Sequence, residues 1–251
     1  MALDNNAFCW NGVVSTDSEA AKAFYQSTIG WQTIEHTFPN GESATMFAAD
    51  GFPRAHLRAP EGGESCRWAS YLRVEDVDAS TAACLANGGG VVLLPNDIAL
   101  GRFSVVSAPS GALLCLYHEA DEQSAMNAPA GPGSRHWTEL QSDDLETDVE
   151  WLKDTFGFEI EEMPIPNGTY YILNSGGKPR GGATASFSDE VAGQWLNWVE
   201  VADVDATLAR VNQAGGSAPA EGQDWPGVGR MAIAHDPTGA VFGVISPAAA
   251  G

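Results

Sequence analysis

Basic residues are scarce in this chain of 251 residues, which has three lysines and nine arginines against 33 aspartates and glutamates. The formal net charge is −21, while hydrophobic residues make up 44% and charged residues 18% of the sequence. Those fractions are typical of a folded globular protein and not of a disordered acidic tail. Nucleic acid and anionic membranes are poor partners, because a phosphate backbone has to be neutralised by clustered Lys and Arg that this sequence lacks.

Long apolar runs are also missing, since no stretch approaches the roughly 20 residues that a membrane-spanning helix needs. The first residues, Met1 to Asp4, show no basic region followed by an apolar stretch, so we expect no secretory signal and a cytoplasmic protein. The sequence has no Cys-x-x-Cys pair, which argues against zinc ribbons and redox motifs. We expect buried free thiols in a reducing compartment at the four cysteines, Cys9, Cys66, Cys84 and Cys115.

The excess of acidic residues has two interpretations that the sequence leaves open. Acidic side chains are spread along the whole chain, as in a solvated surface that is adapted to salt or keeps the protein in solution. Alternatively, a field of this sign concentrates a cationic ligand near a cleft.

A long internal repeat organises the chain. Residues 8–17 (FCWNGVVSTD) align without gaps with residues 135–144 (RHWTELQSDD), at an offset of 127. Other matches at this offset are Trp10/Trp137, Gly30/Gly157, Trp68/Trp195 and Asp76/Asp203, and Gly111/Gly239 follows at 128. The sequence is therefore a tandem duplication, with a first domain at 1–118, a linker at 119–134 and a second domain at 135–247.

Each half contains two similar cycles of secondary structure. In the first cycle a strand over 8–14 leads into Thr16–Glu19, which has the spacing of a capping box, then into a helix that ends at Gly30. A second cycle begins with a strand over 68–74, and short apolar strands follow every helix. The pattern predicts an α+β fold of four βαβββ units.

These residues resemble a known group of proteins. The motifs are Asp17 with Phe24-Tyr25 and Gly30-Trp31, then Val74-Glu75-Asp76-Val77-Asp78, and finally Asp236-Pro237-Thr238-Gly239-Ala240. They look like the vicinal oxygen chelate superfamily, which includes glyoxalase I, extradiol dioxygenases and bleomycin-resistance proteins. The resemblance is to the tandem two-domain form and covers nearly the whole chain. It implies tandem glyoxalase/bleomycin-resistance-like domains whose four units form two open cups, each with a metal or ligand inside.

The resemblance also implies where metal ligands would stand. Carried over residue by residue, three ligand positions of the metal-dependent members become Trp10, Ala69 and Cys115 in the first half and Trp137, Leu196 and Gly243 in the second. Only Cys115 could bind a metal, and a divalent site needs three or four convergent N, O or S donors. We therefore expect no metal and no cofactor in either half. His56 stands near the fourth strand, where the family often places a ligand, and we interpret it as an isolated histidine.

Strand alternation indicates which side chains share a face with these positions. Residues that differ between the halves are better candidates for chemistry than those that are identical, so we expect Glu139 and Glu200 to be the candidate catalytic carboxylates. Carboxylates in an apolar wall imply a wet pocket or a partner. The candidate ligand-binding residues are Trp137, Trp198, Trp10, Tyr71, Arg73 and Cys115. The alternative is that strand curvature sends both glutamates to solvent.

Two functions of different classes remain. The first is a metal-independent protein that binds or sequesters a small molecule, possibly cationic or aromatic, as the bleomycin-resistance proteins do. The second is a glyoxalase- or lyase-like enzyme on a small carbonyl or aromatic compound, with Glu139 or Glu200 as general base. Because Glu139 and Trp198 stand against Gly12 and Tyr71 in the first half, we expect the principal site in the second half.

Overall fold

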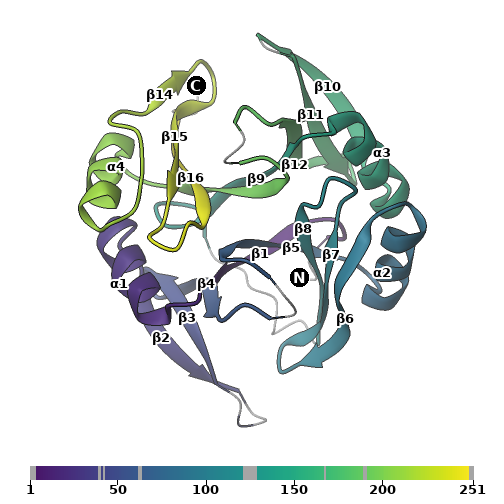
Figure 1. Ribbon diagram of the computed structural model, residues 1–251, viewed down its shortest axis with the longest axis horizontal. Coiled ribbons are helices and arrows are strands. Elements are labelled where there is room, and N and C mark those ends of the chain that lie inside the picture. The colour runs from purple at the N-terminus through teal and green to yellow at the C-terminus, as the bar shows by residue number, and fades with distance from the viewer. Residues whose placement is uncertain are drawn as a thin grey trace. The chain divides into compact units, whose positions relative to one another are not determined.

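A computed structural model describes residues 4–38, 41, 43–61, 64–120, 129–166, 168–188 and 191–248. Within these ranges the chain forms sixteen strands and four helices (Figure 1). The elements up to residue 119 are β1 (Phe8–Val14), α1 (Ser18–Thr28), β2 (Gln32–Thr37), β3 (Ser43–Ala49), β4 (Phe52–Arg58), β5 (Arg67–Arg73), α2 (Val77–Ala86), β6 (Gly90–Ile98), β7 (Gly101–Ser107) and β8 (Leu113–Glu119). Those that follow are β9 (Arg135–Ser142), α3 (Leu145–Phe156), β10 (Glu159–Ile165), β11 (Gly168–Ser175), β12 (Lys178–Ala185), β13 (Gln194–Glu200), α4 (Val204–Gln213), β14 (Gln223–Trp225), β15 (Gly229–His235) and β16 (Val241–Pro247).

The strands form two eight-stranded curled sheets with the same strand order. That order is β2-β3-β4-β1-β5-β8-β7-β6 in one sheet and β10-β11-β12-β9-β13-β16-β15-β14 in the other. In each βαβββ repeat the strand before the helix pairs in parallel with the last strand, as β1 does with β4, and the remaining pairs are antiparallel hairpins. The repeated βαβββ pattern confirms the predicted α+β fold class.

The two compact units of the chain do not coincide with its two sheets. Contacts between Cα atoms divide the chain into unit 1, made of Met1–Trp10, Ala69–Met126 and Thr138–Leu196, and unit 2, made of Asn11–Trp68, Asn127–Trp137 and Asn197–Gly251. Each unit thus joins pieces from both halves of the repeat. The boundaries 1–118 and 135–247 stay a prediction, and half of the expected linker, residues 121–128, lies outside the described residues.

Each unit has its own hydrophobic core beneath a pair of helices. In unit 1, α2 lies beside α3, and in unit 2, α1 lies beside α4 (Figure 1). The core of unit 1 includes Leu72, Leu114, Leu140, Leu152 and Trp195. The core of unit 2 includes Phe24, Tyr25, Trp31, Phe47 and Phe242. None of the helices in the described ranges combines the length and apolar character that crossing a bilayer requires.

An aspartate stands at the N-cap of each of the four helices, and three of these side chains cap the helix. The side chains of Asp17, Asp76 and Asp203 accept hydrogen bonds from the third helical amide of α1, α2 and α4, at 2.9–3.0 Å. Such a contact satisfies one of the amides that a helix start leaves unpaired. The capping box at Thr16–Glu19 is wrong by one residue, because Asp17 is the N-cap. Helix α3 ends as predicted at Gly157, whose φ of 72° favours glycine.

A buried carboxylate fixes the last turn of unit 2. Asp236, between β15 and β16, accepts hydrogen bonds from the amides of Thr238 and Ala240, at 2.8 and 3.0 Å. Its other oxygen accepts a 2.9 Å bond from the hydroxyl of Tyr25 on α1, and Trp68 donates to that hydroxyl at 2.8 Å. Burial and the neighbouring Asp236 charge raise the pKa of Tyr25, so the phenol keeps its proton.

The corresponding turn of unit 1 uses a carboxylate from another element. Ala108 stands at the position that matches Asp236 at the offset of 128. The carboxylate comes from Asp148 on α3, which is fully buried and accepts from the Ser110 amide at 3.1 Å and the Ser142 hydroxyl at 2.6 Å. The aspartate that accepts from the turn amides therefore lies in the turn itself in unit 2 and on helix α3 in unit 1.

Candidate functional site

Two buried polar side chains of β9 lie on the face away from the core of unit 1. Leu140 belongs to that core, so Glu139 and Gln141 on either side of it point to the opposite face of the strand. Their exposed fractions are 7% and 0%. At this depth the hydrogen-bond partners of the two side chains decide what they can bind.

The carboxylate of Glu139 accepts a hydrogen bond at each oxygen. Gln141 donates from Nε2 to Oε1 at 2.7 Å, and Tyr170 of β11 donates from its hydroxyl to Oε2 at 2.9 Å. Hydrogen bonds to an ionised carboxylate are among the stronger ones in proteins. The three side chains form a polar cluster, which we call the Glu139 cluster.

Gly182 makes room for this cluster. It is the register partner of Glu139 on β12, and a Cβ atom built on it would lie 1.9 Å from the hydroxyl oxygen of Tyr170. Any larger residue at this position would displace the phenol that holds Glu139. The glycine is therefore required by the close approach of a side chain and not by its backbone angles.

One acceptor of the Glu139 cluster has no partner among the described residues. Because Nε2 of Gln141 donates to Glu139, its Oε1 is the remaining acceptor, and this atom is buried and makes no hydrogen bond there. A buried acceptor without a donor costs about 1–3 kcal/mol. A ligand that brings an N–H or O–H group to this atom would recover that energy.

In unit 2 the indole of Trp198 covers Gly243, one of the positions where metal-dependent members of the superfamily carry a ligand. Trp198 of β13 is the register partner of Gly243 of β16, and a Cβ atom on Gly243 would lie 2.2 Å from the indole carbon Cε3. Trp198 is 5% exposed, and its Nε1 has no hydrogen-bond partner in the described part of the chain. The ring thus fills the space that a ligating side chain at residue 243 would occupy.

Replacing Gly243 with alanine is expected to destabilise the fold by about 1–3 kcal/mol, because the new methyl group overlaps the indole of Trp198. Urea unfolding monitored by circular dichroism measures the change. The same substitution in a Trp198→Ala background is the control, since the clash is then absent. An equal loss of stability in both backgrounds would show that the indole is not the obstacle.

Glu200, Trp137 and Trp198 all belong to unit 2. Oε2 of Glu200 lies 3.8 Å from Nδ1 of His136, and the Glu200 side chain is 22% exposed. The neighbours of Glu200, Val199 and Val201, belong to the core, so the carboxylate leaves the strand on the other face. A partly hydrated carboxylate beside an exposed histidine differs from Glu139, whose carboxylate is buried and bonded at both oxygens.

The predicted residues of the first half lie in unit 1 and are buried or half-buried. Tyr71 and Cys115 are register partners on β5 and β8, with exposures of 6% and 0%, and Trp10 is half-buried. Arg73 donates from Nε to both carboxylate oxygens of Glu119, at 2.8 and 2.9 Å. This internal ion pair occupies one edge of the guanidinium of Arg73, a predicted ligand-binding residue.

The side chains at the superfamily's metal positions do not fit a metal. The six positions hold two tryptophans, an alanine, a leucine, a glycine and the buried Cys115. No group of three His, Cys, Asp or Glu side chains in the described ranges could hold an ion. A divalent site needs such a convergent set. The donor chemistry of this chain therefore disagrees with a metal centre at these positions.

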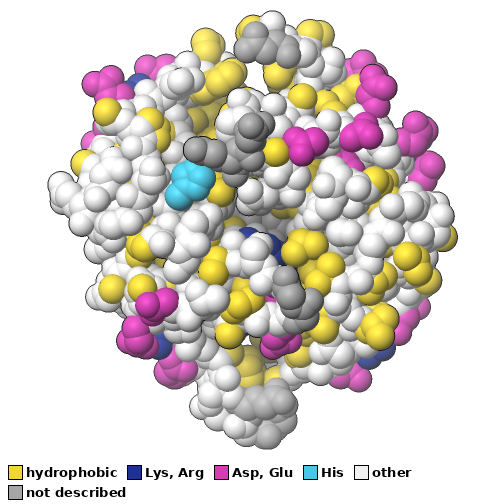
Figure 2. All heavy atoms as spheres, in the orientation of Figure 1, with side chains coloured by type: hydrophobic (Ala, Val, Ile, Leu, Met, Phe, Trp, Pro, Cys, Tyr) yellow, Lys and Arg dark blue, Asp and Glu magenta, His cyan; other side chains and the backbone are white. Residues whose placement is uncertain are grey.

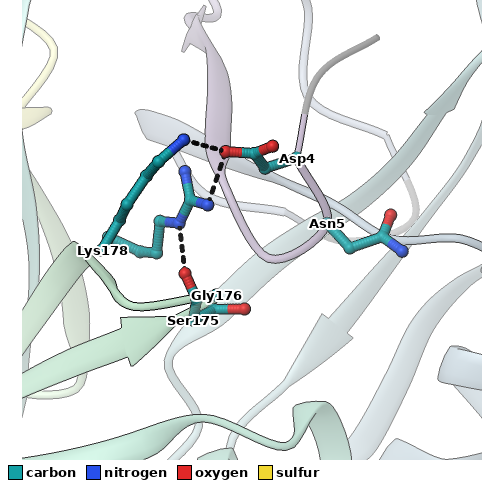
Figure 3. A pocket seen from close by; sticks show the side chains of 6 residues that line it. Asp4, Asn5, Ser175, Gly176 and Lys178 are labelled. Atoms are coloured by element: carbon teal, nitrogen blue, oxygen red, sulfur yellow. Dashed lines mark hydrogen bonds and ion pairs between the residues drawn. The ribbon is translucent and has the colours of Figure 1, made fainter.

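A surface pocket of unit 1 is lined by charged residues that lie far apart in the sequence. Lys178 and Arg180 of β12 both donate to Oδ2 of Asp4, at 2.8 and 2.7 Å (Figure 3). Hydrogen bonds from Lys178 and Arg180 lower the pKa of Asp4 to about 2. These contacts fasten the residues before β1 to the β11–β12 hairpin.

The acidic surplus is visible on the surface of unit 1. Figure 2 shows Asp and Glu side chains gathered over α3 and β10. The exposed acidic residues of these elements and of the α3 N-terminus are Asp143, Asp144, Glu146, Glu150, Asp154, Glu159, Glu161 and Glu162. Because all are solvated, they favour the interpretation of a hydrated surface at this place.

Tyr170 and Gly182 are the residues of the Glu139 cluster that sequence reasoning missed. Alternation places Gln141 beside Glu139 on one strand, but the phenol comes from β11 through a β11–β12–β9 pairing. A register between strands that are separated by 30 or more residues leaves no local signal. An aligned glycine opposite a glutamate could be noticed only once that register is known.

Comparisons with known proteins give relatives over nearly the whole chain, although no protein-family model matches it. The protein CFP32 of Mycobacterium tuberculosis (strain CDC 1551 / Oshkosh), which carries the name of a glyoxylase, is 33% identical over 247 residues, covering 95% of this chain and 94% of that protein. The anthracycline biosynthesis protein DnrV of Streptomyces peucetius is 29% identical over 264 residues, covering 96% and 95%.

Solved structures share the fold. The Mn(II)-bound glyoxalase from Novosphingobium aromaticivorans superposes with a TM-score of 0.63 at 19% identity, over 96% of this chain and 82% of that one. The 2,3-dioxygenase LapB from Pseudomonas sp. KL28 gives a TM-score of 0.60 at 13% identity, over 96% and 91%. With a relative at 33% identity along almost its full length and this shared fold, the chain belongs to the vicinal oxygen chelate superfamily, in its two-domain form.

Proposed function

We propose that this protein binds a small molecule without the help of a metal, and that the Glu139 cluster is its recognition site. The ligand carries N–H or O–H donors, as an amine does, next to an aromatic or other planar surface. The observation that carries the proposal is the buried, unpartnered Oε1 of Gln141 beside a carboxylate. We place the protein in the cytoplasm, where its four free cysteines would stay reduced.

The hydrogen bonds of Glu139 favour binding over proton transfer. A general base needs a carboxylate oxygen that can reach the substrate proton. Here both oxygens accept from Gln141 and Tyr170, and each of these bonds stabilises the anion and so makes it a weaker base. The carboxylate instead orients the Gln141 amide and supplies a negative charge near it, which complements a cationic ligand.

The relatives support the ligand class in part. DnrV is named as a protein of anthracycline biosynthesis. Anthracyclines are planar aromatic compounds, and many carry a protonated amine, so their chemistry suits a carboxylate and an unpaired acceptor. This similarity is to a protein that shares 29% of its residues with the chain, so the anthracycline serves as a probe and not as an assigned ligand.

An enzyme that acts on a small carbonyl compound is the second candidate function. It is favoured by the glyoxylase name of CFP32, the relative at 33% identity. In this case Glu139 or Glu200 would take a proton from the substrate carbon. Glu200 is the more accessible of the two, since its side chain is 22% exposed and its Oε2 lies 3.8 Å from Nδ1 of His136.

Replacing Gln141 with leucine is expected to weaken binding of an amine-bearing aromatic ligand by about tenfold or more, which corresponds to about 1.4 kcal/mol. Leucine is one heavy atom smaller than glutamine and offers neither an acceptor nor a donor. The probe is daunorubicin, titrated at constant ionic strength against tryptophan and anthracycline fluorescence. The matched control is Gln32→Leu, which alters an exposed glutamine on β2 of the other unit.

A second assay separates binding from catalysis. The hemithioacetal of methylglyoxal and glutathione is offered to the metal-free protein, and turnover is followed by absorbance. Binding of the probe without turnover supports the proposal. Turnover that Glu139→Gln or Glu200→Gln abolishes, or daunorubicin binding that Gln141→Leu leaves unchanged, contradicts it.

A further inference from the structure

The surface pocket at the β11–β12 hairpin of unit 1 concentrates positive charge. Lys178 and Arg180 lie two residues apart on β12, in a chain that has only three lysines and nine arginines. Both donate to the same oxygen of the Asp4 carboxylate, at 2.8 and 2.7 Å (Figure 3). Two positive charges therefore face one negative charge.

The pocket offers more room than the Asp4 carboxylate needs. It is a cavity of about 280 Å³, whereas one water molecule takes about 30 Å³ of liquid. The Arg180 side chain is 12% exposed and that of Lys178 is 64% exposed, so a group in solution can reach the lysine. Because the other lining residues are neutral, the two cations and one carboxylate give the lining a net charge of +1. These neutral residues are Asn5, Ser175 and Gly176.

The segment before β1 is held on unit 1 by contacts that do not involve the Asp4 side chain. The amide of Asn6 donates to the carbonyl oxygen of Arg73, and the amide of Arg73 donates to the carbonyl oxygen of Ala7, both at 2.9 Å. Nδ2 of Asn6 donates to the carbonyl oxygen of Phe156 at 2.7 Å. The segment therefore keeps its place when the Asp4 carboxylate turns away from the two cations.

Unit 2 repeats the arginine of this arrangement. Residues 52–56 (FPRAH) of β4 align with residues 178–182 (KPRGG) of β12 at an offset of 126, and the strand register shifts at the same point in both copies. Arg54, the counterpart of Arg180, donates from Nη1 to the carbonyl oxygen of Pro129 at 2.7 Å, in the segment before β9. An arginine that holds the preceding segment is thus a shared part of the fold.

Lys178 and Asp4 are the charges that unit 1 adds to this shared arrangement. In unit 2, Phe52 stands in the place of Lys178, and Gly131 stands in the place of Asp4 at the offset of 127. Unit 2 therefore forms the same fold without either charge. A role beyond the fold accounts for their presence in unit 1.

We propose that this pocket binds a phosphate dianion, either free or as the ester group of a small molecule, with Lys178 and Arg180 as its partners and Asp4 as a built-in competitor. A tethered carboxylate acts at an effective concentration on the order of millimolar, so a free carboxylate of equal charge gains nothing over Asp4. A phosphate group brings a second negative charge and three acceptor oxygens. It can therefore displace Asp4 and balance both cations.

The phosphate pocket is separate from the Glu139 cluster. None of the residues that line it contributes a side chain to that cluster, and the two sites select ligands of opposite charge. The strongly acidic chain repels anions at long range, so a phosphate that binds here does so through these local contacts.

Titration of the ¹⁵N-labelled full chain with phenyl phosphate, at pH 7.5 and fixed ionic strength, tests the proposal. The Nε–H group of Arg180, which donates to the carbonyl oxygen of Ser175 at 3.1 Å, is the NMR reporter. We expect a dissociation constant of about 1 mM or tighter, since two charge-assisted contacts support affinities of this order. Benzoate, which carries one charge, is expected to bind at least tenfold more weakly. Inorganic phosphate is the second probe, and the tighter of the two phosphates identifies the free or the esterified form as the ligand.

Three variants separate the roles of the charges. Lys178→Gln is expected to weaken phenyl phosphate binding at least fivefold, because one of the two cations is lost. Asp4→Ala is expected to tighten it at least threefold and to let benzoate bind, because the competitor is gone. Lys153→Gln is the matched control, since it removes an exposed lysine beside Glu150 on α3 of the same unit, and binding is expected to stay within twofold.

Circular dichroism of each variant shows whether it is folded. If Lys178→Gln does not fold, Lys178→Met keeps the apolar part of the side chain, and the same fivefold loss is expected. Three results would each overturn the proposal: no phosphate binding to the wild type up to about 10 mM, equal losses in Lys178→Gln and Lys153→Gln, or weaker phosphate binding to Asp4→Ala than to the wild type.

Discussion

Replacing Asp236 with alanine is expected to lower the free energy of unfolding by about 3–5 kcal/mol, because several buried donors lose their acceptor together. The Tyr25 hydroxyl and the amides of Thr238 and Ala240 all donate to this carboxylate. Tyr25 is fully buried, and Asp236 is 3% exposed, so water cannot replace the lost acceptor without opening the core.

Urea or thermal unfolding of the variant measures this loss. Asp203→Ala in the same unit is the matched control, since that aspartate is an exposed helix cap whose removal costs about 0.5–2 kcal/mol. Tyr25→Phe in the Asp236→Ala background should recover part of the loss, because it removes one of the orphaned donors. A loss for Asp236→Ala no larger than that for Asp203→Ala would mean that the turn finds other partners.

Lowering the pH from 7 to 4.5 is expected to reduce stability by about 2–3 kcal/mol through His56 alone. Its pKa is about 3 in the folded protein, against 6.5 for an ordinary histidine. Below pH 6.5 the unfolded chain binds a proton at this ring that the folded chain refuses, so unfolding is favoured as the pH falls. The loss continues until about pH 3.

The groups that face His56 explain the sign and the window. Arg58 and Arg67 disfavour the protonated ring, while Glu64 favours it. Glu64 keeps its charge until the pH falls well below 4.5, because its own pKa is about 2. Its contribution to stability is present above pH 4.5 and disappears between about pH 4.5 and 2, so it adds to the loss only in stronger acid.

Urea unfolding at half-unit steps between pH 7 and 4.5 measures the slope. His56→Gln should flatten it over this range, whereas His36→Gln, on an exposed strand position, should leave it unchanged. A slope that survives in His56→Gln would assign the acid sensitivity to other groups.

Much of the fold could be predicted because its signals are local. The signals for helix ends are single residues: aspartate at the helix starts (Asp17, Asp76 and Asp203) and Gly157 at the end of α3. The repeat is recognised by matching short segments at an offset of 127. The family resemblance then supplied the pairing of the units into two cups, which these signals do not contain.

The candidate site could be predicted only along a strand. Alternation places Glu139 and Gln141 on one face, but it gives no information on Tyr170, which comes from another strand. Arg73 illustrates the same limit, since its partner Glu119 is 46 residues away and neutralises it. The direction of a side chain follows from its own strand, whereas its partners depend on pairings that a single sequence does not specify.

The different positions of Asp236 and Asp148 mean that the two halves of the duplication are not interchangeable. Unit 2 joins the Tyr25 helix to the Asp236 turn, and unit 1 joins the Asp148 helix to the Ala108 turn. Two copies of the first half would pair the Tyr25 helix with the Ala108 turn, leaving the phenol and the turn amides without a carboxylate. Two copies of the second half would press two buried carboxylates together. Each turn therefore depends on a carboxylate that only the present pairing of the two halves supplies.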